Sequence, residues 1–181
     1  MYSTRIHGRG GQGVVTSAEL LAVAAFIEGR YAQAFPSFGS ERTGAPVAAF
    51  CRIDDRPVRT HEPIAVPDAV VVADPTVMHQ VDVLAGLRPG GYLLVNTARA
   101  LDLPGACLVP ATELAREYVG KPLPNAALLG ALAALTGWVS LESVLAAIGQ
   151  RFRSPVAERN AAAARAVYEI VATRQGERVG A

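Results

Sequence analysis

Few residues of this chain could hold a metal ion or a redox group. Its 181 residues include only two cysteines, Cys51 and Cys107, which lie far apart and form no C-x-x-C pair. An iron–sulfur cluster needs about four thiolates, so the chain cannot hold one by itself. The three histidines, His7, His61 and His79, lack the spacing of zinc ligands. We expect no metal site, and we interpret both cysteines, which stand in apolar strand-like runs, as buried and inert.

Long apolar runs are also missing. The run from Leu20 to Ile27 is bounded by Glu19 and Glu28, whereas a membrane span needs about 18 or more apolar residues. The first residues, MYSTRIHGRGG, contain no signal-peptide core. We therefore expect a cytoplasmic protein with no membrane partner.

The charge of the chain gives no indication that it binds nucleic acid. Seventeen basic and sixteen acidic residues leave a net charge of +1, and no basic stripe is present. Hydrophobic residues make up 51% of the chain and charged residues only 18%, with a mean hydropathy of +0.26. This balance favours a protein that turns an apolar surface toward a partner protein.

Motifs for independent catalysis are absent as well. The sequence contains no nucleophile elbow and no paired-carboxylate signature. We assign no catalytic residue to this chain.

The most informative feature that is present is a glycine-rich loop near the N-terminus. Gly8, Gly10 and Gly13 fit the pattern G-x-G-x-x-G, with Gly11 as a fourth glycine, between a β-prone start and an apolar helical pattern. Such a turn brings backbone N–H groups close to an anion, and the following helix aims its positive end at it. Within the loop, Arg9 has the planar fork that matches phosphate oxygens.

Two functions of this loop stay open. It could contact a phosphate-bearing ligand, with Arg9 and Gln12 as partners, or it could be a tight turn that packs against a partner backbone. A stand-alone dinucleotide-binding protein would also need an acidic residue about 20 residues on, at the end of the second strand. Glu28 lies before that strand and Glu41 well past it, which disfavours this alternative.

Hydrophobic periodicity predicts a single α/β domain over residues 1–181, with a mixed, mostly parallel sheet flanked by helices and a helical C-terminal third. Tandem strands within residues 31–53 are the reason to expect a mixed sheet. We expect residues 175–181 to fray. The predicted strands are 31–35, 47–53, 69–73, 92–96 and 107–109. The predicted helices are 13–28, 75–86 after an Asp74 cap, one from near Thr112, one capped by Asn125, one capped by Ser140, and one from Ser154-Pro155 toward Val171.

The loop after the second strand carries candidate interface residues. Phe35 and Phe38 beside Pro36 form the kind of aromatic cluster that carries binding energy at a subunit contact. Glu41 and Arg42 form a candidate ion pair that would fix the loop. We assign all five residues to a subunit interface.

Three segments together resemble the gamma subunit of the pyruvate:ferredoxin oxidoreductase (2-oxoacid:acceptor oxidoreductase) family. They are HGRGGQGVVTSAELLA at 7–22, YAQAFPSFGSERTGAPVAAFCRI at 31–53 and NAALLGALAA at 125–134. The resemblance runs in order over most of the chain. Two positions depart from the family pattern: Ser40 stands where proline is common, and Thr43 where arginine or serine is common.

The resemblance implies a complex that oxidatively decarboxylates a 2-oxoacid to an acyl-CoA and CO₂. Thiamine diphosphate, Mg²⁺ and 4Fe–4S clusters would then belong to thiamine-binding and ferredoxin-like partner subunits, and ferredoxin or an NAD-reducing subunit would accept the electrons. Coenzyme A would be the co-substrate, and the segment from Gly8 to Gly13 (Gly8, Arg9, Gly10, Gly11, Gln12, Gly13) a contact for it or for a partner backbone. A purely structural scaffold subunit remains the alternative.

Overall fold

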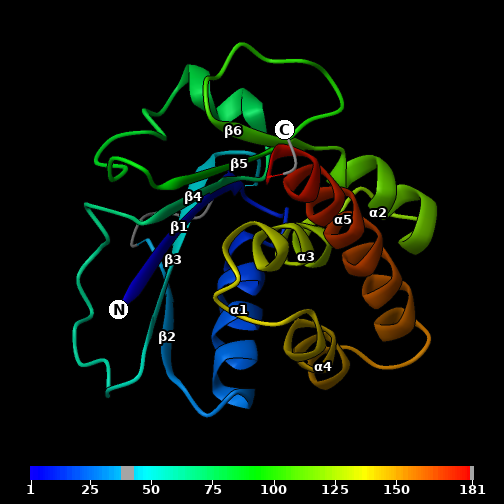
Figure 1. The fold of residues 1–181 in the computed structure, drawn as a ribbon, viewed down its shortest axis with the longest axis horizontal. Coiled ribbons are helices and arrows are strands. Elements are labelled where there is room, and N and C mark those ends of the chain that lie inside the picture. The colour runs from blue at the N-terminus through cyan, green and yellow to red at the C-terminus, as the bar shows by residue number, and fades with distance from the viewer. Residues whose placement is uncertain (38–42, 180–181) are drawn as a thin grey trace.

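Strand β1 lies inside the sheet around which the chain is built (Figure 1). The structure is a computed structural model that describes residues 1–37 and 43–179. Within these ranges a six-stranded sheet has the order β2-β3-β1-β4-β5-β6. The strands are β1 (Tyr2–Arg9), β2 (Tyr31–Pro36), β3 (Pro46–Asp54), β4 (Ala69–Val72), β5 (Tyr92–Asn96) and β6 (Ala106–Val109). The helices are α1 (Val14–Ile27), the 3₁₀ helix η1 (Pro75–His79), α2 (Ala111–Val119), α3 (Asn125–Thr136), α4 (Leu141–Arg151) and α5 (Val156–Val179).

The sheet is mixed, as the sequence predicted. Strands β1, β4, β5 and β6 run parallel, while β3 pairs antiparallel with both β1 and β2. Strand β2 therefore runs in the same direction as β1 with β3 inserted between them. The prediction of a single α/β domain with a mostly parallel sheet is confirmed.

Two hydrophobic clusters cover the two faces of the sheet. In β4, Val70 and Val72 belong to the smaller cluster with Val77 of η1, whereas Ala69 and Val71 belong to the larger cluster with the helices. This alternation is the period of two that a strand imposes. Helices α1, α3, α4 and α5 lie together on one side of the sheet (Figure 1), and the other side is covered by η1 and loops.

Most predicted boundaries are confirmed to within two residues. Helix α1 begins after Gly13, and Gly29 (φ 76°) follows its last turn as a C-terminal glycine should. Ser140 caps α4, its Oγ accepting from the Ser143 N–H at 3.1 Å. The predicted end of α5 was wrong, because that helix continues past Val171 to Val179. The fraying of residues 175–181 stays a prediction.

The predicted helix over 75–86 was wrong as well. Asp74 does cap a helical turn, accepting from the Thr76 N–H at 2.9 Å, but η1 ends at His79. The segment is rich in β-branched residues, which lose side-chain freedom in a helix. Asp82 then begins a separate turn by accepting from the Leu84 N–H at 3.1 Å. Two short turns replace one helix, and both Val77 and Val83 are buried.

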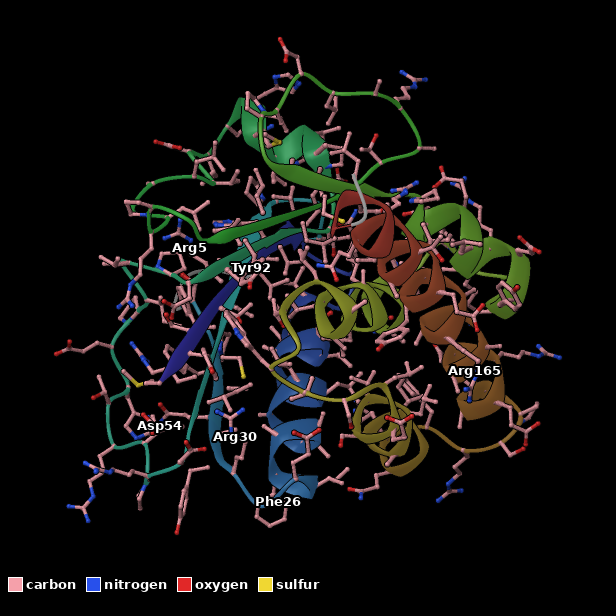
Figure 2. The ribbon with its side chains drawn as sticks, viewed as in Figure 1. Arg5, Phe26, Arg30, Asp54, Tyr92 and Arg165 are labelled. Atoms are coloured by element: carbon pink, nitrogen blue, oxygen red, sulfur yellow. The ribbon has the colours of Figure 1, made fainter. Side chains whose placement is uncertain are left out.

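A buried arginine fastens the loops on that face to the sheet. Arg5 of β1, labelled in Figure 2, donates to the carbonyl oxygens of Ile64 at 3.2 Å and Val83 at 3.0 Å, and also to that of Ala85. Its Nε donates to Nε2 of His7 at 2.9 Å. Burial, together with the Arg5 charge, lowers the pKa of His7 to about 4. His7 is therefore a neutral core histidine.

The neutral His7 makes stability depend on pH. Below about pH 6.5 the unfolded chain takes up a proton at His7, and the folded chain does so only near pH 4. The free energy of unfolding should fall by about 3 kcal/mol as the pH drops through this window. In His7→Gln this part of the fall should disappear, as measured by urea denaturation from pH 7.5 to 4. His79→Gln, at an exposed position, is the control and should follow the wild-type profile.

Helices α3 and α5 approach so closely that only glycine fits between them. A Cβ on Gly130 would lie 2.0 Å from the Ala164 carbonyl oxygen. Gly130→Ala should therefore lower the free energy of unfolding by about 2 kcal/mol or more. Gly149→Ala in α4 meets nothing within 4 Å, and should raise it by about 0.5–1 kcal/mol. Equal effects of the two variants on the urea midpoint would contradict the close packing.

Candidate functional site

A cleft of about 730 Å³ opens at the carboxyl ends of β1, β4 and β5. Ligands of open α/β sheets bind in this place, outside the carboxyl ends of strands where the strand order reverses. Order reverses at β1, whose neighbours are β3 on one side and β4 on the other. The cleft is lined by Gly10–Gln12 of the glycine loop, Ala73–Thr76 after β4, Asn96–Arg99 after β5, residues 112, 113 and 116 of α2, and residues 122–124 before α3.

The glycine loop is a tight turn followed directly by a helix. The Gln12 N–H donates to the Arg9 carbonyl oxygen at 3.1 Å, closing a four-residue turn. Gly11 has φ 91° at the third position of that turn, where a positive φ favours glycine. Gly13, with φ 76°, is the N-terminal residue of α1 and offers no side-chain cap. The first N–H groups of α1 therefore have no side-chain acceptor from this residue.

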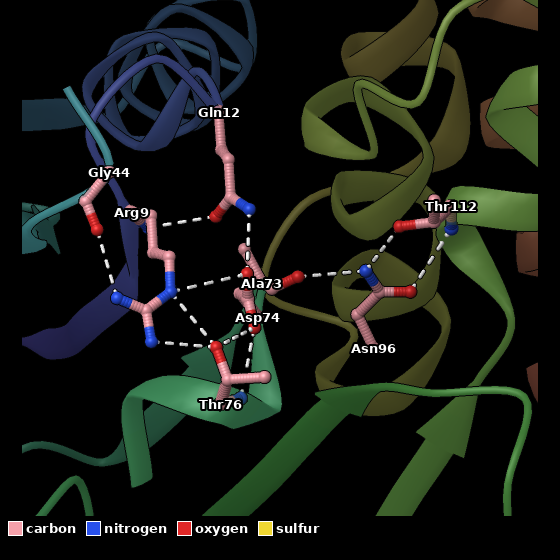
Figure 3. Close-up of polar contacts among 8 residues, drawn as sticks. All are labelled: Arg9, Gln12, Gly44, Ala73, Asp74, Thr76, Asn96 and Thr112. Carbon is pink, nitrogen blue, oxygen red and sulfur yellow. Dashed lines mark hydrogen bonds and ion pairs between the residues drawn. The ribbon is translucent and has the colours of Figure 1, made fainter. Parts of the chain in front are cut away.

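The side chains of Arg9 and Gln12 bond within the protein (Figure 3). Arg9 donates to Thr76 Oγ1 from Nε at 2.9 Å and from Nη2 at 2.8 Å, and to the Gly44 carbonyl oxygen at 2.9 Å. Gln12 accepts from the Arg9 N–H and donates to Asp74 Oδ2, both at 2.8 Å. The guanidinium is therefore anchored to two other loops, one of which holds the cleft-lining residue Thr76.

Asp74 supplies the negative charge of this network. Its Oδ2 lies 3.6 Å from Arg9 Nε. Burial opposes the charged form, but hydrogen bonds from Thr76 and Gln12 and the charge of Arg9 keep the pKa of Asp74 below its usual range. The sequence marked Asp74 only as a helix cap, and its role beside the glycine loop was missed. Its place directly after a buried strand was the available signal.

Asn125 is a second residue whose role the sequence did not reveal. It was predicted to cap α3, but Pro124 occupies the cap and Asn125 is the first residue of the helix. The Asn125 side chain instead packs on Gly13, since a Cβ there would lie 2.8 Å from Asn125 Nδ2. Asn125 is only 8% exposed. Asn125 thus places a side-chain amide at the amino terminus of α1.

Asn96 joins the remaining walls of the cleft. Its Nδ2 donates to the Ala73 carbonyl oxygen at 2.8 Å and to Thr112 Oγ1 at 2.7 Å, and its Oδ1 accepts from the Thr112 N–H at 3.1 Å. One side chain therefore ties the ends of β4 and β5 to the start of α2 (Figure 3). Nothing in the local pattern of the sequence distinguished Asn96 from other strand ends.

Comparison with known proteins identifies the family. The model described as pyruvate ferredoxin/flavodoxin oxidoreductase matches residues 3–170. The pyruvate/ketoisovalerate oxidoreductases common subunit gamma of Thermococcus kodakarensis is 51% identical over 177 residues, covering 93% of this chain and 96% of the relative. The chain belongs to the gamma-subunit family of the 2-oxoacid:ferredoxin oxidoreductases.

Two further relatives agree with this assignment. The pyruvate synthase subunit PorC of Methanothermobacter marburgensis is 47% identical over 171 residues, covering 93% of this chain and 97% of the relative. The crystal structure of pyruvate oxidoreductase subunit PORC from Thermotoga maritima has a TM-score of 0.83 at 39% identity, covering 93% and 95% of the two chains. The resemblance stated from the sequence is confirmed, and the chain is an oxidoreductase subunit.

The interface residues predicted for this gamma-type subunit fall partly within the described ranges. Phe35 is half-buried against Phe50, with ring centroids 5.2 Å apart, and Arg52 lies over its ring at 5.4 Å. Pro36 ends β2 opposite Ala49. Phe38, Glu41 and Arg42 lie outside the described residues. The assignment of these five residues to an interface stays a prediction.

The cysteines and other metal-ligand types are dispersed. Burial raises the pKa of Cys51 to about 12, so this thiol is inert as predicted. Cys107 is only half-buried, at the sheet edge formed by β6, so its prediction as buried was wrong. In the described ranges, no three His, Cys, Asp or Glu residues gather as a possible metal site. None of the helices described there is long and apolar enough to cross a membrane.

Proposed function

We propose that this chain is the gamma subunit of a thiamine diphosphate-dependent complex that oxidatively decarboxylates a 2-oxoacid to an acyl-CoA and CO₂. Two relatives support pyruvate and ketoisovalerate as substrates, since one is a subunit common to both oxidoreductases and another belongs to a pyruvate synthase. A shared gamma subunit implies that the 2-oxoacid is selected by other chains. We place the acyl acceptor, coenzyme A, on this chain.

The reaction divides between this chain and its partners. Decarboxylation leaves a carbanion, which needs an electron sink that amino-acid side chains supply poorly. Thiamine diphosphate with Mg²⁺ would provide that sink in the thiamine-binding subunits. The two electrons would pass through 4Fe–4S clusters of ferredoxin-like subunits to ferredoxin or an NAD-reducing subunit, since two cysteines are too few to hold a cluster here.

The main support for an acceptor site is the close approach of the Asn125 side chain to Gly13, at the start of α1. The amino terminus of α1 carries partial positive charge and N–H groups without a side-chain cap. The Asn125 amide lies directly beside it, since a Cβ on Gly13 would lie 2.8 Å from Asn125 Nδ2, and an amide NH₂ group can donate to a bound anion. An anionic diphosphate, as in coenzyme A, would satisfy both. Gly13 and Asn125 directly follow the lining residues Gln12 and Pro124. Arg9 bonds to Thr76, which also lines the cleft, and would add a charged donor.

Two alternatives make different predictions. A stand-alone dinucleotide-binding protein would bind NAD(H) by itself, and a titration of the purified chain tests this directly. Strand β2 ends without an acidic residue for the ribose, which disfavours it. A purely structural scaffold would leave the kinetics of coenzyme A independent of the glycine loop.

Arg9→Ala tests the acceptor site in the assembled complex. Because a hydrogen bond to a charged group contributes about 1.5–3 kcal/mol, the KM for coenzyme A should rise by about tenfold or more. The matched control is Arg165→Ala, on the exposed side of α5 away from the cleft (Figure 2). Steady-state kinetics at saturating 2-oxoacid measure both. An unchanged KM in Arg9→Ala, with the complex intact, would favour the scaffold.

The chain purified alone should be inactive. With 2-oxoacid, coenzyme A, thiamine diphosphate, Mg²⁺ and an artificial electron acceptor, we expect no oxidation above background, because no electron sink belongs to this subunit. Anaerobic assays of the chain alone and of the complex at equal concentration measure this. Turnover by the chain at a rate comparable with the complex would overturn the division of labour.

A further inference from the structure

The glycine loop is held closed from two sides. On the backbone side, the Gln12 N–H donates to the Arg9 carbonyl oxygen at 3.1 Å. On the side-chain side, Gln12 folds back so that its Oε1 accepts from the Arg9 N–H at 2.8 Å. Only an acceptor can serve at this second position, because the backbone group is a donor.

Asp74 decides which end of the Gln12 amide faces the loop. Its Oδ2 contacts Gln12 Nε2 at 2.8 Å, while its Oδ1 accepts from the Thr76 N–H at 2.9 Å and the Thr76 hydroxyl at 2.7 Å. An ionised carboxylate has no donor, so Gln12 must present its NH₂ group to Asp74 and its oxygen to Arg9. The donor and acceptor of each hydrogen bond from Arg9 through Gln12 to Asp74 are thereby fixed (Figure 3).

We propose that Asp74 is a positioning residue of the acceptor site, which acts through Gln12 to lock the turn that carries Gly10 and Gly11 into the cleft. The inference rests on the proposed function for its effect on coenzyme A. The lock itself rests only on the five side-chain and backbone contacts described above. Thr76 and Arg9 keep the carboxylate in place, because Thr76 Oγ1 donates to Asp74 and accepts from Arg9.

An asparagine at position 74 would keep the size of the side chain but could not keep the lock. Its amide presents one acceptor and one donor end, and the present neighbours, Thr76 on one side and Gln12 on the other, both donate. The NH₂ group of the asparagine would then face another donor, either Thr76 or the Gln12 amide. Alternatively, Gln12 must rotate and turn its own NH₂ group toward the Arg9 N–H. Either way a donor loses its acceptor.

The lock also predicts a specific rescue. If Gln12→Glu is added to Asp74→Asn, the new glutamate can accept from both the Arg9 N–H and the new asparagine, whose oxygen can accept from Thr76. Every donor regains an acceptor, with the same net charge. Gln12→Glu alone instead places two carboxylates in contact and should fail. A role of Asp74 as a local negative charge alone would instead leave Gln12→Glu without effect, because that variant keeps the carboxylate at position 74.

The experiment is amide hydrogen exchange of the full chain by NMR, read at the Arg9 N–H. Asp74→Asn should speed exchange of this N–H by about tenfold or more, because a donor without its acceptor opens readily. The double variant should return exchange to near the wild-type rate. Asp102→Asn, at an exposed position outside the cleft, is the matched control. Wild-type exchange in Asp74→Asn, or failure of the double variant to restore protection in a folded chain, would overturn the lock.

The consequence for function is measured in the assembled complex. Asp74→Asn should raise the KM for coenzyme A by about fivefold, with a smaller change in kcat at saturating coenzyme A, since misplacement of a binding loop acts mainly on binding. If exchange at Arg9 responds as described but neither Arg9→Ala nor Asp74→Asn alters this KM, the lock stands and the proposed acceptor site is wrong. If Arg9→Ala raises the KM and Asp74→Asn does not alter exchange, the acceptor site stands and the lock is wrong.

Discussion

The parallel pairing of β1 with β4, and of β4 with β5, is the constraint on which the rest of this structure depends. Parallel neighbours bring their carboxyl ends to the same edge of a sheet. The register places His7 opposite Val72, and Val72 opposite Val95, so the loops that follow all leave the sheet at one level. Arg9, Asp74 and Asn96 meet there, although 87 positions separate the first from the last. No local feature of any one loop would have assembled the cleft.

The glycine loop turns this edge into a surface that can receive a ligand backbone or phosphate. Gly11 and Gly13 adopt positive φ, and Gly13 leaves room for Asn125 to reach the start of α1. A side chain at Gly13 would both strain the backbone and displace Asn125. The close approach of α1 to α3 and the open amino terminus of α1 are therefore two results of the same missing Cβ.

The sequence predicted what depends on periodicity and on local turn chemistry. The helix after Gly13, the strand of Val70 and Val72, and the Ser140 cap follow from rules that act over a few residues. The predicted helix at 75–86 was wrong because its β-branched residues lose side-chain freedom in a helix, and two short turns bury Val77 and Val83 instead. Asn125 was mistaken for a cap because its partner, Gly13, is more than 100 positions away. The network of Asp74 depends in the same way on contacts between distant segments.

Arg5 has a consequence for how the loops on the thinly covered face can vary between related chains. Its guanidinium holds those loops through the carbonyl oxygens of Ile64, Val83 and Ala85, and every amino acid carries such an oxygen. The attachment therefore places few demands on the side chains of the loops, provided that the backbone keeps its path. Lysine, with a compact ammonium group, lacks the planar fork that spans these acceptors. Related chains can thus keep arginine at this strand position while the loops that it holds change in sequence.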